Sequence, residues 1–448
     1  MKSRTSALVA VALGLALARP PFEFVNPEPL PAKRIIASLG KLLKKRPNDP
    51  DLHYKLARVH YLALINQTKL VPTFVDRGVR IAASDHFAIG FLDSLRWDEA
   101  YARATHKLGL DKVKAWGKAM RVKFAAERKR ILKQLEEQHW HPPAPSALEL
   151  EEHAKQAMAH FDRAVELKPK NALYRLGRAC LAKQCFDLER ASVLPRRAMI
   201  KSLAVWTEAK ARAEFYATFK LTIRDDVRGG MLPAEGLTGL VSHEAAIAFL
   251  RLAKDLAKPT EKQQARIAEV EAGLKRLRAL RRGIVTPILI GRSVDDTLQR
   301  LVAPKTVVEF DLDGDGVTER WPWVRADAGI LVWDPTHAAN IRSGRQLFGS
   351  VTWFLFHRNG FDALQLLDDD QDGVLTGAEL VGLAIWTDRN QDGRSTASEV
   401  VALEQSDIVA IRVRAQRDSD GVLGHASGVQ YADGTTRPTF DWVTGPAR

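Results

Sequence analysis

Two acidic loops near the C-terminal end of the chain carry side chains whose types and spacing suit a divalent cation. In the first loop Asp368, Asp370 and Asp372 alternate, Gly373 follows them, and Glu379 stands at the twelfth position. Calcium prefers six to eight hard oxygen ligands, which alternate inward-pointing side chains can supply. The glycine allows a sharp turn, and the glutamate can give both of its oxygens. We therefore expect this loop to bind calcium.

A second loop repeats this arrangement, and its first aspartate lies 20 residues after that of the first loop. Asp388, Asn390 and Asp392 alternate, and Gly393 and Glu399 follow at the sixth and twelfth positions. Both loops match the EF-hand loop, which uses positions 1, 3, 5, 7, 9 and 12. The alternative is that both are acidic surface loops that form only local turns. The expected ligands are Asp368, Asp370, Asp372, the Val374 carbonyl, Thr376 and Glu379 in the first loop, and Asp388, Asn390, Asp392, the Arg394 carbonyl, Thr396 and Glu399 in the second.

The spacing of the two loops departs from that of an ordinary EF-hand pair. Only residues 380–387 separate them, which is too short for one helix to leave, a linker to turn and another helix to arrive. If this segment is one helix, the loops lie about 14 Å apart, at about 1.5 Å per residue. We therefore expect two neighbouring sites that share the intervening segment.

A third acidic loop lies upstream and gives a further candidate calcium site. Asp311, Asp313 and Asp315 alternate before a glycine, and Glu319 follows at the ninth position. The twelfth position is Pro322, so this loop is not of the EF-hand type. It is similar to the DxDGDG loops found between strands in extracellular calcium-binding proteins. A solvated acidic turn without metal is the alternative.

The stretch that contains "FDLDGDG", "GILVWDP" and "AIWTDRNQDG" resembles the C-terminal EF-hand-type domain of exported bacterial calcium-binding proteins, over residues 305–413. The resemblance implies a further loop after Asp334. There Thr336, Ala338 and Arg345 stand where oxygen ligands are expected, so we infer that this loop has lost its metal. One hypothesis is that the Arg345 guanidinium replaces the charge of the ion by pairing with Asp334.

The first part of the chain, residues 19–285, reads as helical. In "AMAHFDRAVELKPKNALYRLGRACLA" the residues Ala157, Phe161, Ala164 and Pro169 fall at the small, aromatic, small and proline positions of a tetratricopeptide repeat, which this stretch resembles. Small residues let neighbouring helices approach, and the aromatic ring fills the space between repeats. The alternative is an irregular helical bundle.

The predicted fold class is therefore α+β, with a helical, repeat-like domain over 19–285 and a smaller mixed domain of short strands and EF-hand-type loops over 286–448. A closing hairpin is expected at Asp433 and Gly434. The charge follows the same division: the net charge is −9 after residue 300, although the whole chain carries +13. A basic body thus carries an acidic domain, which we expect calcium to fold while the body melts independently.

The first residues predict export. Lys2 and Arg4 precede a short apolar run, and "ALA" ends at residue 18, so residues 1–18 read as a signal peptide. A retained anchor or an ordinary apolar start are the alternatives. We expect no transmembrane span after cleavage, since no other apolar run is long enough. Export permits a disulfide between Cys180 and Cys185, but only if no continuous helix contains both.

These features favour an exported, calcium-binding, non-catalytic scaffold located in the periplasm, in the cell envelope or outside the cell. The basic segment 112–133 suggests a protein or an anionic envelope polymer as the partner, and export makes nucleic acid unfavourable. A membrane surface, the chain's own acidic domain or plain core packing of this segment are the alternatives. A dockerin-like docking module and an envelope enzyme are the other functions considered. The sequence contains no HExxH, GxSxG or P-loop motif, so we expect no enzyme.

Overall fold

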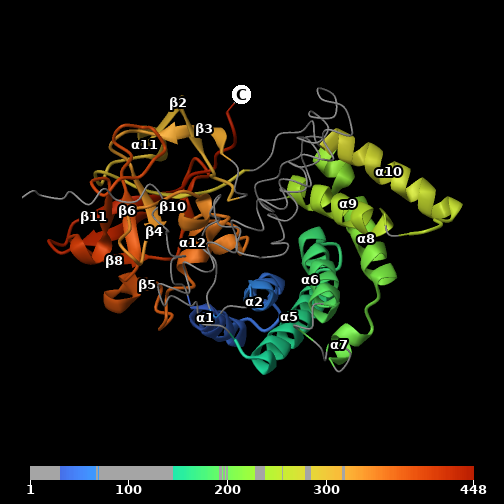
Figure 1. The fold of residues 1–448 in the computed structure, drawn as a ribbon. Coiled ribbons are helices and arrows are strands. Elements are labelled where there is room, and N and C mark those ends of the chain that lie inside the picture. Colours follow the sequence, from blue (N-terminus) through green and yellow to red (C-terminus); the bar gives the residue numbers. More distant parts are fainter. Residues whose placement is uncertain are drawn as a thin grey trace, which may run out of the picture.

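The structure, a computed structural model, describes residues 31–66, 69, 145–190, 194, 197, 200–227, 238–254, 256–277, 284–314 and 318–447. Helices make up its first part and an antiparallel sheet its last, so the predicted α+β class is confirmed (Figure 1). The predicted signal peptide and the basic segment 112–133 lie outside the described residues.

Helices that pair through short turns form the first part of the chain. Turns that contain Pro47 and Pro169 join α1 to α2 and α5 to α6, because proline cannot continue a helix. Ser146 and Glu149 form a capping box at the start of α5. The helices are α1 (Ala32–Lys45), α2 (Pro50–Asn66), α5 (Ala147–Leu167), α6 (Ala172–Arg190), α7 (Lys201–Ala204), α8 (Glu208–Val227), α9 (Thr238–Lys254) and α10 (Glu261–Leu277).

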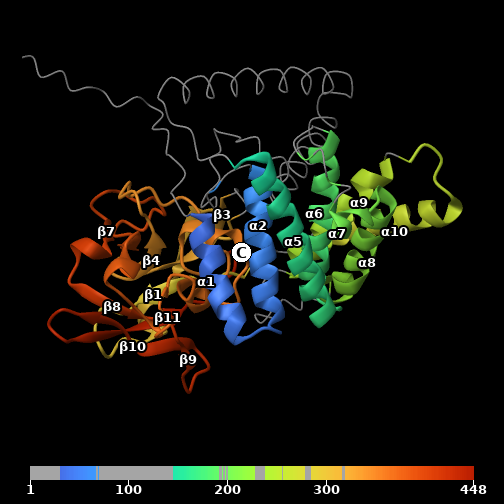
Figure 2. The same ribbon diagram turned by 90° about the horizontal axis from the view of Figure 1, so that it is seen from below.

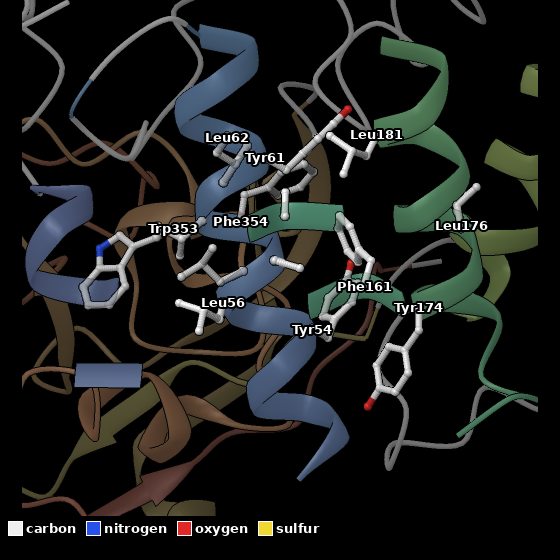
Figure 3. Packing of buried hydrophobic residues seen from close by; sticks show 14 of the residues in the cluster. Tyr54, Leu56, Tyr61, Leu62, Phe161, Tyr174, Leu176, Leu181, Trp353 and Phe354 are labelled. Carbon is white, nitrogen blue, oxygen red and sulfur yellow. The ribbon is translucent and has the colours of Figure 1, made fainter. Parts of the chain in front are cut away.

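Close packing joins α2, α5 and α6. A Cβ atom on Gly177 would lie 2.6 Å from the ring of Phe161, so the missing side chain of this glycine makes room for the aromatic ring. The ring of Tyr54 lies 5.7 Å from that of Phe161 and 5.1 Å from that of Tyr174 (Figure 3). The ring of Phe161 therefore fills the space between α5 and its neighbours α2 and α6. Whether the helices form a tetratricopeptide array remains a prediction.

Both cysteines lie in the continuous helix α6 and do not form a disulfide. Among the described helices, none combines the length and apolar character that crossing a bilayer requires.

A nine-stranded sheet forms the centre of the second part, in the order β5-β8-β10-β11-β1-β4-β6-β7, with β9 paired to β10. Its strands are antiparallel wherever they pair, and the final hairpin β10–β11 turns at Gly434, whose φ is +85°. The strands are β1 (Ile288–Ile290), β4 (Gly329–Trp333), β5 (Val374–Thr376), β6 (Leu383–Trp386), β7 (Val400–Ala402), β8 (Ile408–Arg412), β9 (Gln416–Arg417), β10 (Leu423–Tyr431) and β11 (Thr436–Asp441).

A separate hairpin, β2 (Val302–Phe310) with β3 (Glu319–Val324), packs on a second core that is rich in tryptophan. Short helices connect the strands: α11 (Leu298–Leu301), α12 (Gly360–Leu364), and the 3-10 turns Gly344–Gln346, Thr352–Phe354, Gly377–Leu380 and Leu403–Gln405.

The helices α1 and α2 belong to both parts of the molecule. Their buried residues and those of the sheet domain form one continuous hydrophobic cluster. Arg58 Nε donates to the carbonyl of Phe354 at 3.3 Å, and Lys55 pairs with Asp362 at 3.5 Å. In Figures 1 and 2, α1 and α2 lie between the sheet domain and the helices α5–α10. The two predicted domains are therefore joined by a shared core.

Candidate metal centre

The first acidic loop is fixed at both ends by buried apolar residues. Leu367 directly precedes Asp368 and is wholly buried, and Leu380, which directly follows Glu379, is 5% exposed. Within the loop, Gln371 and Gly373 adopt positive φ values of 64° and 97°. These left-handed residues bend the backbone sharply, which is what the glycine at position 6 was expected to allow.

Three aspartates converge in this loop. One carboxylate oxygen from each of Asp368, Asp370 and Asp372 can be chosen so that all three lie within 4.8 Å of one another. Asp368 is only 3% exposed, and burial raises the pKa of its carboxyl group. Its Oδ2 accepts a hydrogen bond from the Gly373 amide at 3.1 Å, but its buried Oδ1 has no hydrogen-bond partner. A buried polar atom without a partner is costly, and a cation would satisfy it.

The glutamate at position 12 closes the loop. Glu379 Oε1 accepts the Asp369 amide at 2.6 Å, and Glu379 Oε2 accepts the Thr376 amide at 3.1 Å. Both carboxylate oxygens therefore face the loop backbone. The local turns named as the alternative are present as well, since Asp372 Oδ1 accepts the Val374 amide at 2.7 Å. Such turns hold the carboxylates in place and are compatible with a metal site.

The second loop repeats these bonds position by position. Asp388 Oδ2 accepts the Gly393 amide at 2.9 Å, and Glu399 accepts the amides of Arg389 at 3.0 Å and Thr396 at 3.2 Å. Asp388 is wholly buried, and this burial raises the pKa of its carboxyl group. The two loops therefore have the same internal frame.

A tryptophan that the sequence did not indicate as a site residue lies beside the second loop. Trp323 Nε1, in β3, donates to Asp388 Oδ2 at 2.7 Å and so orients the first ligand of this loop. The tryptophan ring also packs at 5.7 Å from Trp386, at the end of β6. Only the abundance of tryptophan in this part of the sequence could have drawn attention to it.

The segment between the loops is not a helix. Residues Leu383–Trp386 form β6, which pairs with β4 on one side and β7 on the other. The short helix α12 precedes the first loop and the 3-10 turn Gly377–Leu380 ends it, whereas β6 and β7 flank the second loop. The helix–loop–helix arrangement of an EF-hand is not formed around either loop, whereas the loops themselves retain the predicted spacing.

The third acidic loop is described only in part. Asp311 and Asp313 are 4% and 2% exposed, and Glu319 begins β3, but Asp315 lies outside the described residues. Arg345, which is fully buried, donates from Nε to the carbonyl of Gly314 in this loop at 2.6 Å.

The proposed pairing of Arg345 with Asp334 is not supported by these contacts. The carboxylate of Asp334 instead accepts the amides of Ala338 at 3.1 Å and Ala339 at 2.8 Å. The guanidinium of Arg345 packs over the ring of Phe354 at 3.8 Å. Through its hydrogen bond to the Gly314 carbonyl, Arg345 therefore anchors the loop that contains Asp311.

Asp369, the second residue of the first loop, contacts a distant helix. Arg34 Nη2 donates to its Oδ2 at 3.1 Å, Ser38 Oγ to its Oδ1 at 3.4 Å, and Lys41 Nζ to its carbonyl at 2.6 Å. All three donors come from α1, more than 320 residues earlier in the chain. No local sequence pattern could have found this contact.

Two comparisons with known proteins give a match. The family model of the SPM domain matches residues 295–444. The iron-regulated protein FrpA of Neisseria meningitidis serogroup C is 33% identical over 143 residues, which are 30% of this chain and 13% of that protein. This chain thus spans about an eighth of the length of that relative. The region with the acidic loops is therefore similar to the SPM domain family, and the helical part lies outside the residues that this family model matches.

Proposed function

We propose that this chain is an exported protein that binds calcium in loops 368–379 and 388–399, and that it acts as a non-catalytic scaffold. The observation that carries the proposal concerns the buried Asp368 Oδ1. This atom has no hydrogen-bond partner, and two further carboxylates lie close to the Asp368 side chain. The similarity to a protein named FrpA and to the SPM domain supports a secreted or surface location.

The donor set of each loop fits calcium, since all of its atoms are hard oxygens. In the first loop Asp368, Asp370 and Asp372 would provide carboxylate oxygens, and the Val374 carbonyl, Thr376 and Glu379 would provide the remaining oxygens. The bound ion would neutralise carboxylates that otherwise repel one another. The loop's own hydrogen bonds hold Asp368 and Glu379 in position, so part of the ordering cost is met before binding.

In the second loop the same roles fall to Asp388, Asn390, Asp392, the Arg394 carbonyl, Thr396 and Glu399. Asp311, Asp313, Asp315 and Glu319 remain the candidate ligands of a third site.

The paired helices are proposed as the interaction part of the scaffold. Their basic character favours a protein or an anionic envelope polymer as the partner, and export disfavours nucleic acid. A dockerin-like docking function is less well supported, because neither loop lies between the paired helices of that family.

Calorimetric titration of the full chain with calcium tests the proposal. Two to three ions per chain are expected, with dissociation constants of about 10⁻⁴ to 10⁻³ M or tighter, as in extracellular modules. Asp372→Ala and Asp392→Ala should each remove one ion. Asp433→Asn changes an exposed turn aspartate outside the loops and should leave the stoichiometry unchanged. A stoichiometry below one would refute calcium binding by these loops.

A further inference from the structure

Helix α1 holds both neighbours of the first calcium ligand. Arg34 Nη2 lies within hydrogen-bond distance of the Leu367 carbonyl at 3.4 Å, and it also binds the Asp369 carboxylate. Lys41 binds the Asp369 carbonyl. Asp368 lies between these two anchored residues, so its backbone position depends on the helix.

The three contacting residues form one face of α1. Arg34, Ser38 and Lys41 are spaced four and three residues apart, which places them on one side of a helix. The helix contains five Lys or Arg and no acidic residue, so its charge complements that of the loop. An exposed ion pair by itself contributes only about 0–1 kcal/mol, and Asp369 is 46% exposed. The contact must therefore draw on more than its charges.

A shared hydrophobic core adds the necessary anchorage. Ile35 and Leu39, on the neighbouring face of α1, are wholly buried, and Leu366 and Leu367 at the base of the loop belong to the same cluster. Figure 3 shows the continuation of this core, which includes Leu56 of α2 and Trp353 of the sheet domain. The helix and the base of the loop therefore cannot move apart without opening this core.

We infer that calcium binding in loop 368–379 and the docking of α1 stabilise each other, so that the helical part responds to the state of this loop. This inference rests on the proposed calcium binding and names its regulation. By holding Leu367 and Asp369, α1 fixes the ligand Asp368 before the ion arrives. Because coupling is reciprocal, an ion that favours this loop conformation must favour the docked helix to the same extent. The expectation that the helical body melts independently of calcium is replaced accordingly.

Electrostatics alone predicts the opposite sign, which makes the inference testable. Replacing Arg34 by glutamine leaves the loop region one charge more negative, and simple Coulomb attraction would then strengthen calcium binding. If the contacts of Arg34 with Leu367 and Asp369 dominate, the same change weakens calcium binding. Lys33→Gln provides the matched control, because Lys33 is an exposed neighbour on α1 and loses the same charge.

The first experiment measures calcium affinity in the full chain with the second loop disabled by Asp392→Ala. Arg34→Gln should weaken binding to the first loop about fivefold, at the lower end of common coupling factors. Lys33→Gln should leave the affinity unchanged or raise it slightly. An affinity for Arg34→Gln that equals or exceeds that of Lys33→Gln overturns the inference, while calcium binding itself would stand.

The second experiment follows hydrogen exchange of the amides in residues 32–45 of the full chain. Calcium should slow this exchange about fivefold in the Asp392→Ala variant. It should have no such effect in Asp372→Ala, where the first loop cannot bind. Equal exchange with and without calcium in Asp392→Ala, at saturating calcium, overturns the coupling. If neither variant binds calcium at all, the result refutes the proposed calcium binding itself, and with it the coupling.

Discussion

Acidification should weaken the contact between α2 and α5, because two pairs of histidines lie in it. His53 Nδ1 lies 2.9 Å from His160 Nδ1, and His60 Nδ1 lies 2.8 Å from His153 Nδ1. At this distance one nitrogen of each pair must be unprotonated to accept the hydrogen bond. The contact of His53 Nε2 with the Pro47 carbonyl at 3.0 Å requires a proton on Nε2, so a neutral His53 accepts from His160.

The loss of stability on acidification can be sized from the pKa values of two of these four histidines, His60 and His160. Burial, with His153 and His160 nearby, lowers the pKa of His60 to about 3, and burial, with His53 nearby, lowers that of His160 to about 4. Glu149 and Glu152 favour the protonated form of His153 and partly offset the burial that lowers its pKa.

The unfolded chain takes up protons at His60 and His160 below about pH 6.5, whereas the folded chain does so only at a lower pH. The free energy of unfolding therefore falls as the pH falls from 6.5. At about 1.36 kcal/mol per unit, each of the two histidines costs about 2 kcal/mol at pH 5. This value holds as long as the folded-state pKa stays well below 5.

Urea unfolding of the full chain at pH 7.5 and pH 5.0, followed by far-UV circular dichroism, measures this loss. The loss should be about 2 kcal/mol smaller in His60→Gln than in the unchanged protein. His337→Gln, which changes a 40% exposed histidine outside the α2–α5 contact, should leave it nearly unchanged. Comparing variants removes the contribution of carboxylates that titrate in the same range. Equal losses in His60→Gln and the unchanged protein would refute the reasoning.

Two further predictions concern the sheet domain, and a third concerns α1. Burial raises the pKa of Asp441 to about 7, so the folded protein retains this proton and loses stability as the pH rises above 3.8. Asp441→Asn keeps an oxygen that can accept the Gly360 amide. Its gain in the free energy of unfolding should be about 3 kcal/mol larger at pH 8 than at pH 5. Equal gains at the two pH values, measured by urea unfolding, would contradict this. Gly344→Ala should cost about 3 kcal/mol, because its Cβ would lie 1.8 Å from the backbone oxygen of Leu312, and an unchanged thermal midpoint would count against it. Gly40→Ala, in a part of α1 where the Cβ meets nothing within 4 Å, should instead raise the midpoint, since alanine favours a helix by about 1 kcal/mol.

The acidic loops could be recognised from the sequence because their geometry is local. The hydrogen bonds within each loop join residues at most ten positions apart, such as the Gly373 amide with Asp368 or the Asp369 amide with Glu379. Alternating acids, a glycine at the sixth position and a glutamate at the twelfth therefore predict the loop conformation directly. The start of α5 is equally local, since Ser146 and Glu149 cap the helix from within its first turn.

Only the tertiary structure decided what surrounds the loops. The apolar segment 380–387 could suit a helix or a strand, and its pairing with β4 and β7 makes it part of the sheet. The orientation of Asp388 depends on Trp323, 65 residues earlier, and the clamp on Asp369 comes from Arg34, 335 residues earlier. Such contacts form when separately patterned apolar surfaces pack together, and the spacing of residues along one segment holds no record of which distant segment it will meet.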